Sequence, residues 1–334
     1  MRNERGERRT TDMLMTALGE QITGALSDPS VVEIMMNPDG RLWIERQEIG
    51  RVDTGSELSP HEVERVIRLV ATHAGRDATT TSPIVSAELP IGGERFEGVL
   101  PPVTAGPCFS IRKPAGRVIS FDEYVEQDVI SPQNADALRA AVAERSNILI
   151  VGGTGSGKTT LANALLAEIA HSGDRVVLLE DTRELQCAAK DVVAMRTQPG
   201  SVSLADLVRS TLRLRPDRII IGEVRGGEAL DMLKAWNTGH PGGIATLHAN
   251  SAEAGLSRLE QLIGEVTSNI PFELIAEAVD CVVSIKRDGT SRRVDTVARV
   301  IGTTTHGYEL EPVRPSIRQV VPDPTSQNEK GKQK

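Results

Sequence analysis

The chain has 334 residues, of which 39% are hydrophobic, 25% are charged and only 2% are aromatic. This length is enough for two ordinary domains, whose cores must be built mainly from aliphatic side chains. The formal net charge of −8 disfavours sequence-independent binding of nucleic acid to the protein surface as a whole. Nucleic acid is therefore not expected as a direct ligand.

The expected location is the cytoplasm, with any membrane association peripheral. The three cysteines are far apart and form no CxxC pair, so neither a disulfide framework nor a cysteine-based zinc site is expected. The N-terminus contains arginines but also Glu4, Glu7 and Asp12, and it has no apolar core of the kind found in signal peptides. No apolar run is long enough to span a membrane.

The N-terminal part is expected to be a small α+β domain of residues 10–114, preceded by charged and unstructured residues 1–9. Aliphatic residues recur every four positions from Leu14 to Leu26, which predicts a helix with one buried stripe. Ser59-Pro-His-Glu62 is typical of a capping box that opens a second helix. Strand-like runs separated by turn residues lie at 31–36, 41–45, 96–100 and 109–113.

The pattern changes in the second half of the chain. Residues 115–131 are poorly periodic and are expected to connect two domains. Beyond them, strands alternate with helices, and several strands show no polar alternation, which indicates a buried parallel sheet. We expect the second domain to cover residues 132–321 and the polar tail, residues 322–334, to be unstructured.

The segment Gly152-Gly-Thr-Gly-Ser-Gly-Lys-Thr159 matches the phosphate-binding pattern G-x-x-x-x-G-K-[ST]. Glycines allow the backbone to approach a polyphosphate closely, and the following helix presents its positive end. Lys158 can reach the β- and γ-phosphates, and the Thr159 hydroxyl can bind Mg²⁺. An apolar strand before the loop and a leucine-rich helix after it argue against a chance match. The predicted nucleotide-binding residues of the loop are Gly152, Gly153, Thr154, Gly155, Ser156, Gly157, Lys158, Thr159 and Thr160.

A phosphate loop can bind nucleotide without hydrolysing it. Hydrolysis also needs an oriented water molecule and a second protein group that binds Mg²⁺. Two acidic sites follow strand-like runs: Glu180-Asp-Thr-Arg-Glu184, and Glu223 after three isoleucines. The carboxyl ends of parallel strands meet at the ligand-binding edge of a sheet, which would bring these acids together. A helix cap or a solvated loop is the alternative, and it is stronger for Asp181 than for Glu223.

His240 and His248 flank another apolar run, residues 244–247. Their spacing does not match H-x-x-x-H and no cysteine or third histidine stands nearby, which disfavours zinc. A histidine that ends this strand could instead sense the γ-phosphate from the same sheet edge as Glu223. The alternative, stronger for His240, is a core histidine hydrogen-bonded to the backbone.

Four segments in order resemble the Walker A, Asp box, Walker B and His box of the secretion (traffic) ATPases: GGTGSGKTT, LLEDTREL, RPDRIIIGEVRGGEA and NTGHPGGIATLHANS. The family comprises hexameric motors of type II and type IV secretion and of type IV pili. VVEIMMNPDGRLWIER, GERFEGVLPPV and FSIRKP resemble, more loosely, the N-terminal domain of the type IV branch. The four-cysteine zinc insertion usual in type II members is missing. Among the members of the family, the chain most resembles the conjugative-transfer ATPases.

This resemblance implies a RecA-like P-loop domain with a mainly parallel sheet, preceded by a smaller α+β, PAS-like domain. It also implies that Mg²⁺ is bound together with ATP. Thr159 and Glu223 would hold Mg²⁺, Glu223 partly through water, and Glu184 would be the general base. An exchange of roles between Glu184 and Glu223 is the open alternative.

The resemblance implies further roles around the phosphates. Glu180 and Asp181 would support the loop that carries Glu184, while His248 and His240 would couple the γ-phosphate to domain motion. Four arginines would reach the phosphates from the same or a neighbouring subunit, since the guanidinium fork grips phosphate with two hydrogen bonds. The alternative for each is a solvated surface charge. These arginines are Arg95, Arg112, Arg213 and Arg215.

The implied function is that of a homohexameric ATPase at the inner membrane. It would power pilus assembly or substrate transfer in conjugative type IV secretion, together with inner-membrane and cytoplasmic components of the apparatus. The alternatives are a pilus-type or type II secretion motor, a nucleic-acid-dependent hexameric motor, and a scaffold that binds ATP without hydrolysis. Few aromatics and an acidic balance count against the nucleic-acid motor, and two acidic sites count against the scaffold.

Overall fold

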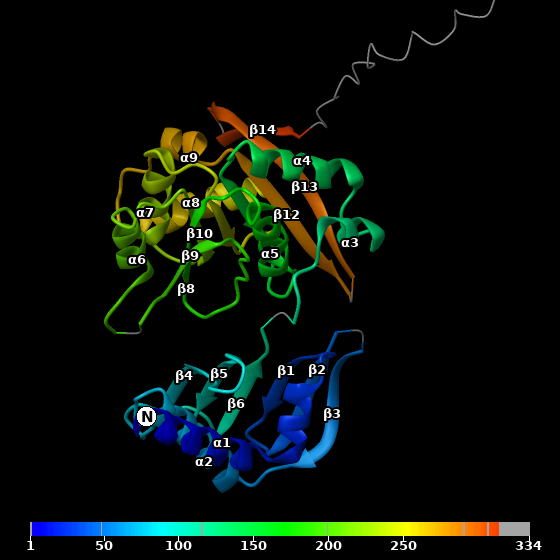
Figure 1. Cartoon of the computed structure of the whole chain (residues 1–334), viewed down its shortest axis with the longest axis vertical. Helices are drawn as coiled ribbons and strands as arrows, with labels where there is room; N and C mark the ends of the chain where they lie inside the picture. Colours follow the sequence, from blue (N-terminus) through cyan, green and yellow to red (C-terminus); the bar gives the residue numbers. More distant parts are fainter. Residues whose placement is uncertain are drawn as a thin grey trace, which may run out of the picture.

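The computed structural model describes residues 2–313 apart from 48, 115, 199, 290 and 306. Two β-sheets, each formed by a separate part of the chain, organise these residues. In Figure 1 the N-terminal sheet lies below the C-terminal sheet, and the segment after β6 joins them. The tail expected to be unstructured, residues 322–334, lies outside the described residues.

The N-terminal sheet is antiparallel and has six strands in the order β3-β2-β1-β6-β5-β4. The helices α1 (Arg2–Ser27) and α2 (Pro60–His73) contact each other and pack on this sheet. This arrangement agrees with the small α+β fold predicted for this part of the chain. The strands are β1 (Val31–Met36), β2 (Arg41–Arg46), β3 (Gly50–Glu57), β4 (Ile84–Glu88), β5 (Arg95–Val99) and β6 (Cys108–Arg112).

The helices of this part begin where local sequence signals allow. The capping box at Ser59 is confirmed: its hydroxyl accepts from the Glu62 backbone N–H, and the Glu62 carboxylate accepts from the Ser59 N–H at 2.8 Å. The predicted stripe from Leu14 to Leu26 is buried in the core. The expectation that residues 1–9 are unstructured is wrong for residues 2–9, because α1 begins at Arg2, with a break at Gly19 (φ 74°).

The second sheet has eight strands in the order β14-β13-β12-β7-β11-β10-β8-β9. All pairs from β12 to β9 are parallel, whereas β13 and β14 extend the sheet in antiparallel pairs. The mainly parallel sheet is therefore confirmed. Its strands are β7 (Ile148–Val151), β8 (Arg175–Glu180), β9 (Asp191–Arg196), β10 (Arg218–Val224), β11 (Ile244–Leu247), β12 (Cys281–Asp288), β13 (Ser291–Thr304) and β14 (Gly307–Pro312).

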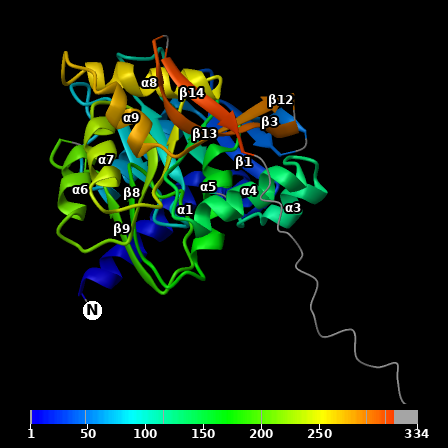
Figure 2. The same cartoon turned by 90° about the horizontal axis from the view of Figure 1, so that it is seen from above.

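Helices cover both faces of this sheet, which explains why its central strands lack polar alternation. In β10, Ile219 and Ile221 enter one core and Ile220 enters the other. The first core includes residues of α6, α7, α8 and α9, and the second includes residues of α3, α4 and α5, as the two sides of Figure 2 show. These helices are α3 (Phe121–Glu126), α4 (Pro132–Ala143), α5 (Lys158–Ile169), α6 (Leu204–Thr211), α7 (Glu228–Asn237), α8 (Ala252–Gly264) and α9 (Phe272–Ala278).

The segment expected to connect the two parts, residues 115–131, contains α3. Ser120 and Glu123 form a capping box at its start, and Phe121 and Tyr124 are buried in the second core cluster of the C-terminal sheet. This segment therefore packs with the second part of the chain from α3 onward. Across the described residues, no helix combines the length and the apolar character needed to cross a bilayer.

Candidate active site

Four loops of the C-terminal sheet meet at one edge because they follow the carboxyl ends of neighbouring parallel strands. The strands β7, β11, β10 and β8 are adjacent in the sheet. At their carboxyl ends lie, respectively, the glycine-rich loop, His248, Glu223 near the end of β10, and an acidic loop that begins at Glu180. Segments up to about 100 residues apart in the sequence thus form one site, as parallel topology requires.

The glycine-rich loop has the backbone geometry of a phosphate-binding loop. Gly155 (φ 69°) and Gly157 (φ 100°) adopt left-handed conformations that other residues rarely take, and Gly157 caps α5. Gly152 has no room for a side chain, because a Cβ there would lie 2.4 Å from the Ile285 carbonyl oxygen. The loop therefore turns its backbone tightly at the N-terminus of α5, where an anion is stabilised.

Lys158, His248 and Glu223 form a connected chain of polar contacts. The Lys158 side chain is nearly buried (8% exposed), and its Nζ lies 3.1 Å from the Gly152 carbonyl oxygen and 3.3 Å from His248 Nδ1. His248 Nε2 lies 2.5 Å from Glu223 Oε1. Because the Lys158 ammonium can only donate, His248 Nδ1 is the acceptor, and the other ring nitrogen, Nε2, faces the Glu223 carboxylate.

The environment of His248 favours its neutral form. Burial, and next the positive charge of Lys158, lower the pKa of His248, although the Glu223 carboxylate opposes the change. Burial also lowers the pKa of Lys158, with Arg112 adding to the effect and Glu223 opposing it. A neutral imidazole between an ammonium and a carboxylate can respond to a new charge at either neighbour.

Glu223 projects from a β-bulge. β10 pairs regularly with β11 at Ile221–Ala245, but Val224 then pairs with Leu247, so β10 uses three residues where β11 uses two. The Thr246 hydroxyl on β11 donates to the Gly222 carbonyl oxygen at 2.6 Å. Bulges re-aim side chains beside active sites, and this one contains Glu223, whose carboxylate contacts His248.

The acidic loop is anchored to β8 and to the phosphate loop. Glu180 ends β8, is 4% exposed, and accepts hydrogen bonds from the backbone N–H groups of Glu184 (2.8 Å) and Leu185 (2.7 Å) through one carboxylate oxygen. The Thr159 hydroxyl donates to Glu184 Oε2 at 3.1 Å. Asn163 on α5 donates to the Glu184 carbonyl oxygen at 3.2 Å. Glu184 therefore stands directly beside the predicted Mg²⁺-binding hydroxyl.

Glu180 differs electrostatically from the other acids. Burial raises the pKa of Glu180 to about 7, against the effect of its two backbone hydrogen bonds, and the charges of Glu184 and Glu88 add to the rise. Burial thus favours the protonated form of Glu180 more than that of an ordinary glutamate. Its structural role in holding the loop is consistent with the supporting position expected for it.

The N-terminal sheet contributes arginines to the same place. Arg95 lines a small cavity together with Thr159, Glu184 and Glu223. Arg112 pairs with Arg95 across β5 and β6, and its charge acts on Lys158 and His248. Both arginines therefore reach the site within one subunit.

Three other predicted residues do not lie at this edge. His240 Nδ1 donates to the Pro216 carbonyl oxygen at 3.1 Å, which is the backbone-bonded alternative left open by the sequence. His240, Arg213 and Arg215 all precede the amino-terminal ends of β10 or β11, and both arginines are exposed. A contact between these residues and the phosphates would need a second subunit, and that role stays a prediction.

Sequence reasoning missed three arginines at the site. The Arg225 guanidinium holds Glu223 Oε2 (2.8 Å from Nε) and lies 3.5 Å from Asp181. Arg292 on β13 donates to the Gly155 carbonyl oxygen at 3.4 Å, and Arg287 on β12 lies beside the same glycine. The glycine-rich sequence VRGG around Arg225 is a signal that could have identified this arginine. No sequence pattern distinguishes Arg287 or Arg292.

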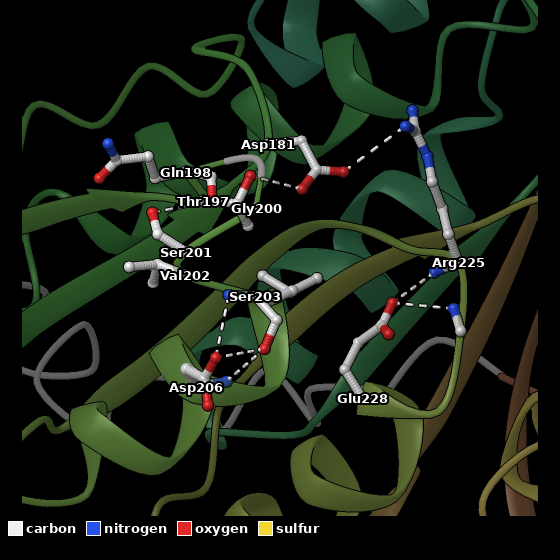
Figure 3. A pocket seen from close by; sticks show the side chains of 12 residues that line it. Asp181, Thr197, Gln198, Gly200, Ser201, Val202, Ser203, Asp206, Arg225 and Glu228 are labelled. Atoms are coloured by element: carbon white, nitrogen blue, oxygen red, sulfur yellow. Dashed lines mark hydrogen bonds and ion pairs between the residues drawn. The ribbon is translucent and has the colours of Figure 1, made fainter.

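A larger pocket of about 620 Å³ adjoins this site and shares Asp181 and Arg225 with it. In Figure 3 these two side chains point toward each other across the pocket. The Thr197 hydroxyl donates to Asp181 at 2.9 Å. Asp181 is exposed, as the solvated-loop alternative expects, and its side chain lines both cavities.

The donor set at the small cavity suits Mg²⁺ held together with a nucleotide. The Thr159 hydroxyl and the carboxylates of Glu184 and Glu223 line one cavity, and oxygen is the ligand that Mg²⁺ prefers. In the described part of the chain, no group of three or more His, Cys, Asp or Glu side chains forms a metal site by itself.

Comparison with known proteins identifies a family across most of the chain. The family model described as "Type II/IV secretion system protein" matches residues 17–299. Conjugal transfer protein TrbB of Rhizobium radiobacter is 52% identical over 309 residues, which cover 92% of this chain and 95% of that protein. Type IV secretion system protein PtlH of Bordetella pertussis is 35% identical over 308 residues, covering 80% of this chain and 90% of that protein.

Solved structures with the same fold include the pilus retraction motor PilT with bound ADP. The TM-score is 0.60 at 19% sequence identity, with 90% of this chain and 83% of that chain covered. At this identity the similarity is evidence for the fold, an antiparallel N-terminal part followed by a mainly parallel sheet.

Proposed function

This chain belongs to the type II/IV secretion system protein family, a family of P-loop ATPases, and we propose that it hydrolyses Mg²⁺-ATP to power a conjugative type IV secretion apparatus. One observation carries the proposal: Lys158, Glu184, Glu223 and His248 come from four separate segments and converge at the carboxyl edge of one sheet. The similarity to TrbB supports conjugation rather than another secretion process.

In this proposal the phosphate loop and Lys158 bind the β- and γ-phosphates of ATP, since the loop offers backbone N–H groups and a nearly buried ammonium. Thr159 and Glu223 would hold Mg²⁺, which neutralises phosphate charge when bound. Glu184 would accept the proton of the attacking water, because its carboxylate lies beside Thr159 and is fixed by the acidic loop.

Other residues would adjust the site as phosphate charge changes. Arg95 and Arg112 would approach the phosphates from the N-terminal sheet. His248 would report the γ-phosphate to Glu223 through the contact between them. We place His240, Arg213 and Arg215 at a boundary with a neighbouring subunit of a homohexamer. The hexamer would act in the cytoplasm against inner-membrane components of the apparatus.

Phosphate release by the purified protein with ATP and Mg²⁺ tests the enzymatic proposal. We expect turnover in the wild type and none in Lys158→Ala, with both proteins folded by circular dichroism. ATP binding without phosphate release by the wild type would support the scaffold alternative instead. Activity that depends on single-stranded DNA and is lost at high salt would support a nucleic-acid motor.

The conjugative role needs a cellular measurement. Plasmid transfer from a donor strain that lacks the gene should be restored by the wild-type chain and not by Lys158→Ala. Normal transfer without the chain would contradict the conjugative role while leaving the ATPase activity intact.

A further inference from the structure

Glu88, the last residue of β4, joins the N-terminal sheet to the acidic loop of the C-terminal part. Its Oε1 accepts a hydrogen bond from the backbone N–H of Arg183 at 3.0 Å. Its other carboxylate oxygen pairs with the guanidinium of Arg196, the last residue of β9. The Glu88 side chain is only 25% exposed. Arg183 and Arg196 both belong to the C-terminal part of the chain, whereas Glu88 belongs to the N-terminal sheet.

The position of this contact along the loop is important, because Arg183 immediately precedes Glu184. On its C-terminal side the loop is held by Glu180, which accepts from the N–H groups of Glu184 and Leu185. The Arg183 N–H is held only from the N-terminal sheet among the hydrogen bonds of the described residues. The backbone around Glu184 is thus fixed from two sides, by one carboxylate from each part of the chain.

The same strand edge also carries the arginines that reach the site. Glu88 is the cross-strand neighbour of Arg95, and Arg95 is the cross-strand neighbour of Arg112. Arg95 lines the cavity that contains Glu184 and Glu223. A displacement of this sheet would therefore move the arginines and release the Arg183 N–H together.

We infer that Glu88 is a positioning residue for ATP hydrolysis: through the Arg183 N–H it fixes the loop that carries Glu184, so turnover requires the N-terminal sheet to be seated on this loop. The inference rests on the proposed function, because it takes Glu184 as part of the hydrolytic site. Glu88 acts through the loop and does not touch the reacting atoms. We therefore expect the loss of the Glu88 contact to lower kcat and to leave ATP binding unchanged.

Three substitutions separate the two contacts of Glu88. Glu88→Ala removes both the Arg183 hydrogen bond and the Arg196 pair, Glu88→Gln keeps an oxygen acceptor, and Arg196→Gln removes only the ion pair. We expect Glu88→Ala to lower kcat by on the order of 10- to 100-fold with little change in KM for ATP, because small misplacements of catalytic groups have effects of this size. Glu88→Gln and Arg196→Gln should retain most of the activity.

Amide hydrogen exchange gives a readout that does not depend on catalysis. In Glu88→Ala, exchange in the loop of residues 181–185 should become faster, while the core strand β7 stays protected. Glu33→Ala is the matched control, since Glu33 is an acid of the same sheet that bonds Ser110 within the sheet at 2.5 Å. We expect it to change neither kcat nor exchange in the loop.

The outcomes separate this inference from the proposed function. If the wild type is active and Glu88→Ala changes neither kcat nor loop exchange, the positioning role of Glu88 is excluded. A loss of activity in Glu88→Gln equal to that in Glu88→Ala would also overturn it, because the charge and not the hydrogen bond would then matter. If Glu88→Ala increases exchange in the loop but the wild type never releases phosphate, the contact between Glu88 and the loop is supported and the proposed hydrolytic function is wrong.

Discussion

Gly222 lies beside Glu180 at the ends of adjacent parallel strands, and a side chain at position 222 would begin 3.1 Å from the Glu180 Cγ. A side chain at position 222 would therefore crowd the buried Glu180 side chain, which would have to move by a few tenths of an ångström. This contact gives a physical reason for the glycine that precedes Glu223.

The first prediction concerns this packing. Gly222→Asp should destabilise the fold by roughly 1–3 kcal/mol, because it overpacks the Glu180 side chain and adds a second acid beside it. Thermal unfolding measures the change. In a Glu180→Ala background the loss should be smaller, whereas Gly116→Asp, at an exposed glycine with open space around it, should be neutral. Equal losses in both backgrounds would contradict the contact.

The second prediction follows from the raised pKa of Glu180, about 7 in the folded protein. Because the folded state binds this proton more tightly than the unfolded chain, the contribution of Glu180 to stability is fully present at low pH and is lost as pH rises to about 7. Glu180→Gln keeps an acceptor for the two backbone N–H groups but cannot ionise. Relative to the wild type, it should be increasingly stabilising between about pH 5 and pH 8. A constant difference in unfolding temperature across this range would refute the prediction.

The third prediction separates the two catalytic acids. Glu184→Gln should bind Mg²⁺-ATP normally but lose about 10²- to 10⁴-fold in kcat, the usual contribution of a general base. Glu223→Gln should instead need a higher Mg²⁺ concentration for half-maximal activity. Fluorescent nucleotide binding and phosphate release at several Mg²⁺ concentrations distinguish them. The reverse pattern would exchange the two assignments.

The fourth prediction concerns contacts between subunits. Light scattering should show a hexamer with ATP and Mg²⁺, and inactive Arg213→Ala/Arg215→Ala subunits should regain activity when mixed with inactive Lys158→Ala subunits. Mixing would pair an intact phosphate loop with intact arginines at some boundaries. A monomer under all conditions, or no recovery in a hexamer that exchanges subunits, would exclude the trans role of these arginines.

The sequence predicted the parts of the site that depend on short-range patterns. The phosphate loop, the capping box at Ser59 and the buried strand of three isoleucines all follow from neighbouring residues. The parallel order of the strands then brings Glu184, Glu223 and His248 to one edge. Local chemistry and one topological rule were sufficient for these residues.

The remaining features depend on contacts that no local pattern records. Glu88 and Arg292 are common surface residue types, and only the fold brings them to the acidic loop and to Gly155. His240 was grouped with His248 although it lies at the opposite end of β11, because sequence proximity does not distinguish the two ends of a short strand. The helix α3 was overlooked since one short turn shows little periodicity.

Because of the bulge at Gly222–Glu223, the direction of the Glu223 side chain depends on the number of residues in this part of β10. Without the extra residue, β10 would keep step with β11, and every side chain beyond Ile221 would point to the opposite face. Deletion of Gly222 would remove no hydrophobic residue, but the Glu223 side chain would then point to the opposite face of the sheet. Insertions and deletions in this strand should thus be far less tolerated than exchanges among its isoleucines.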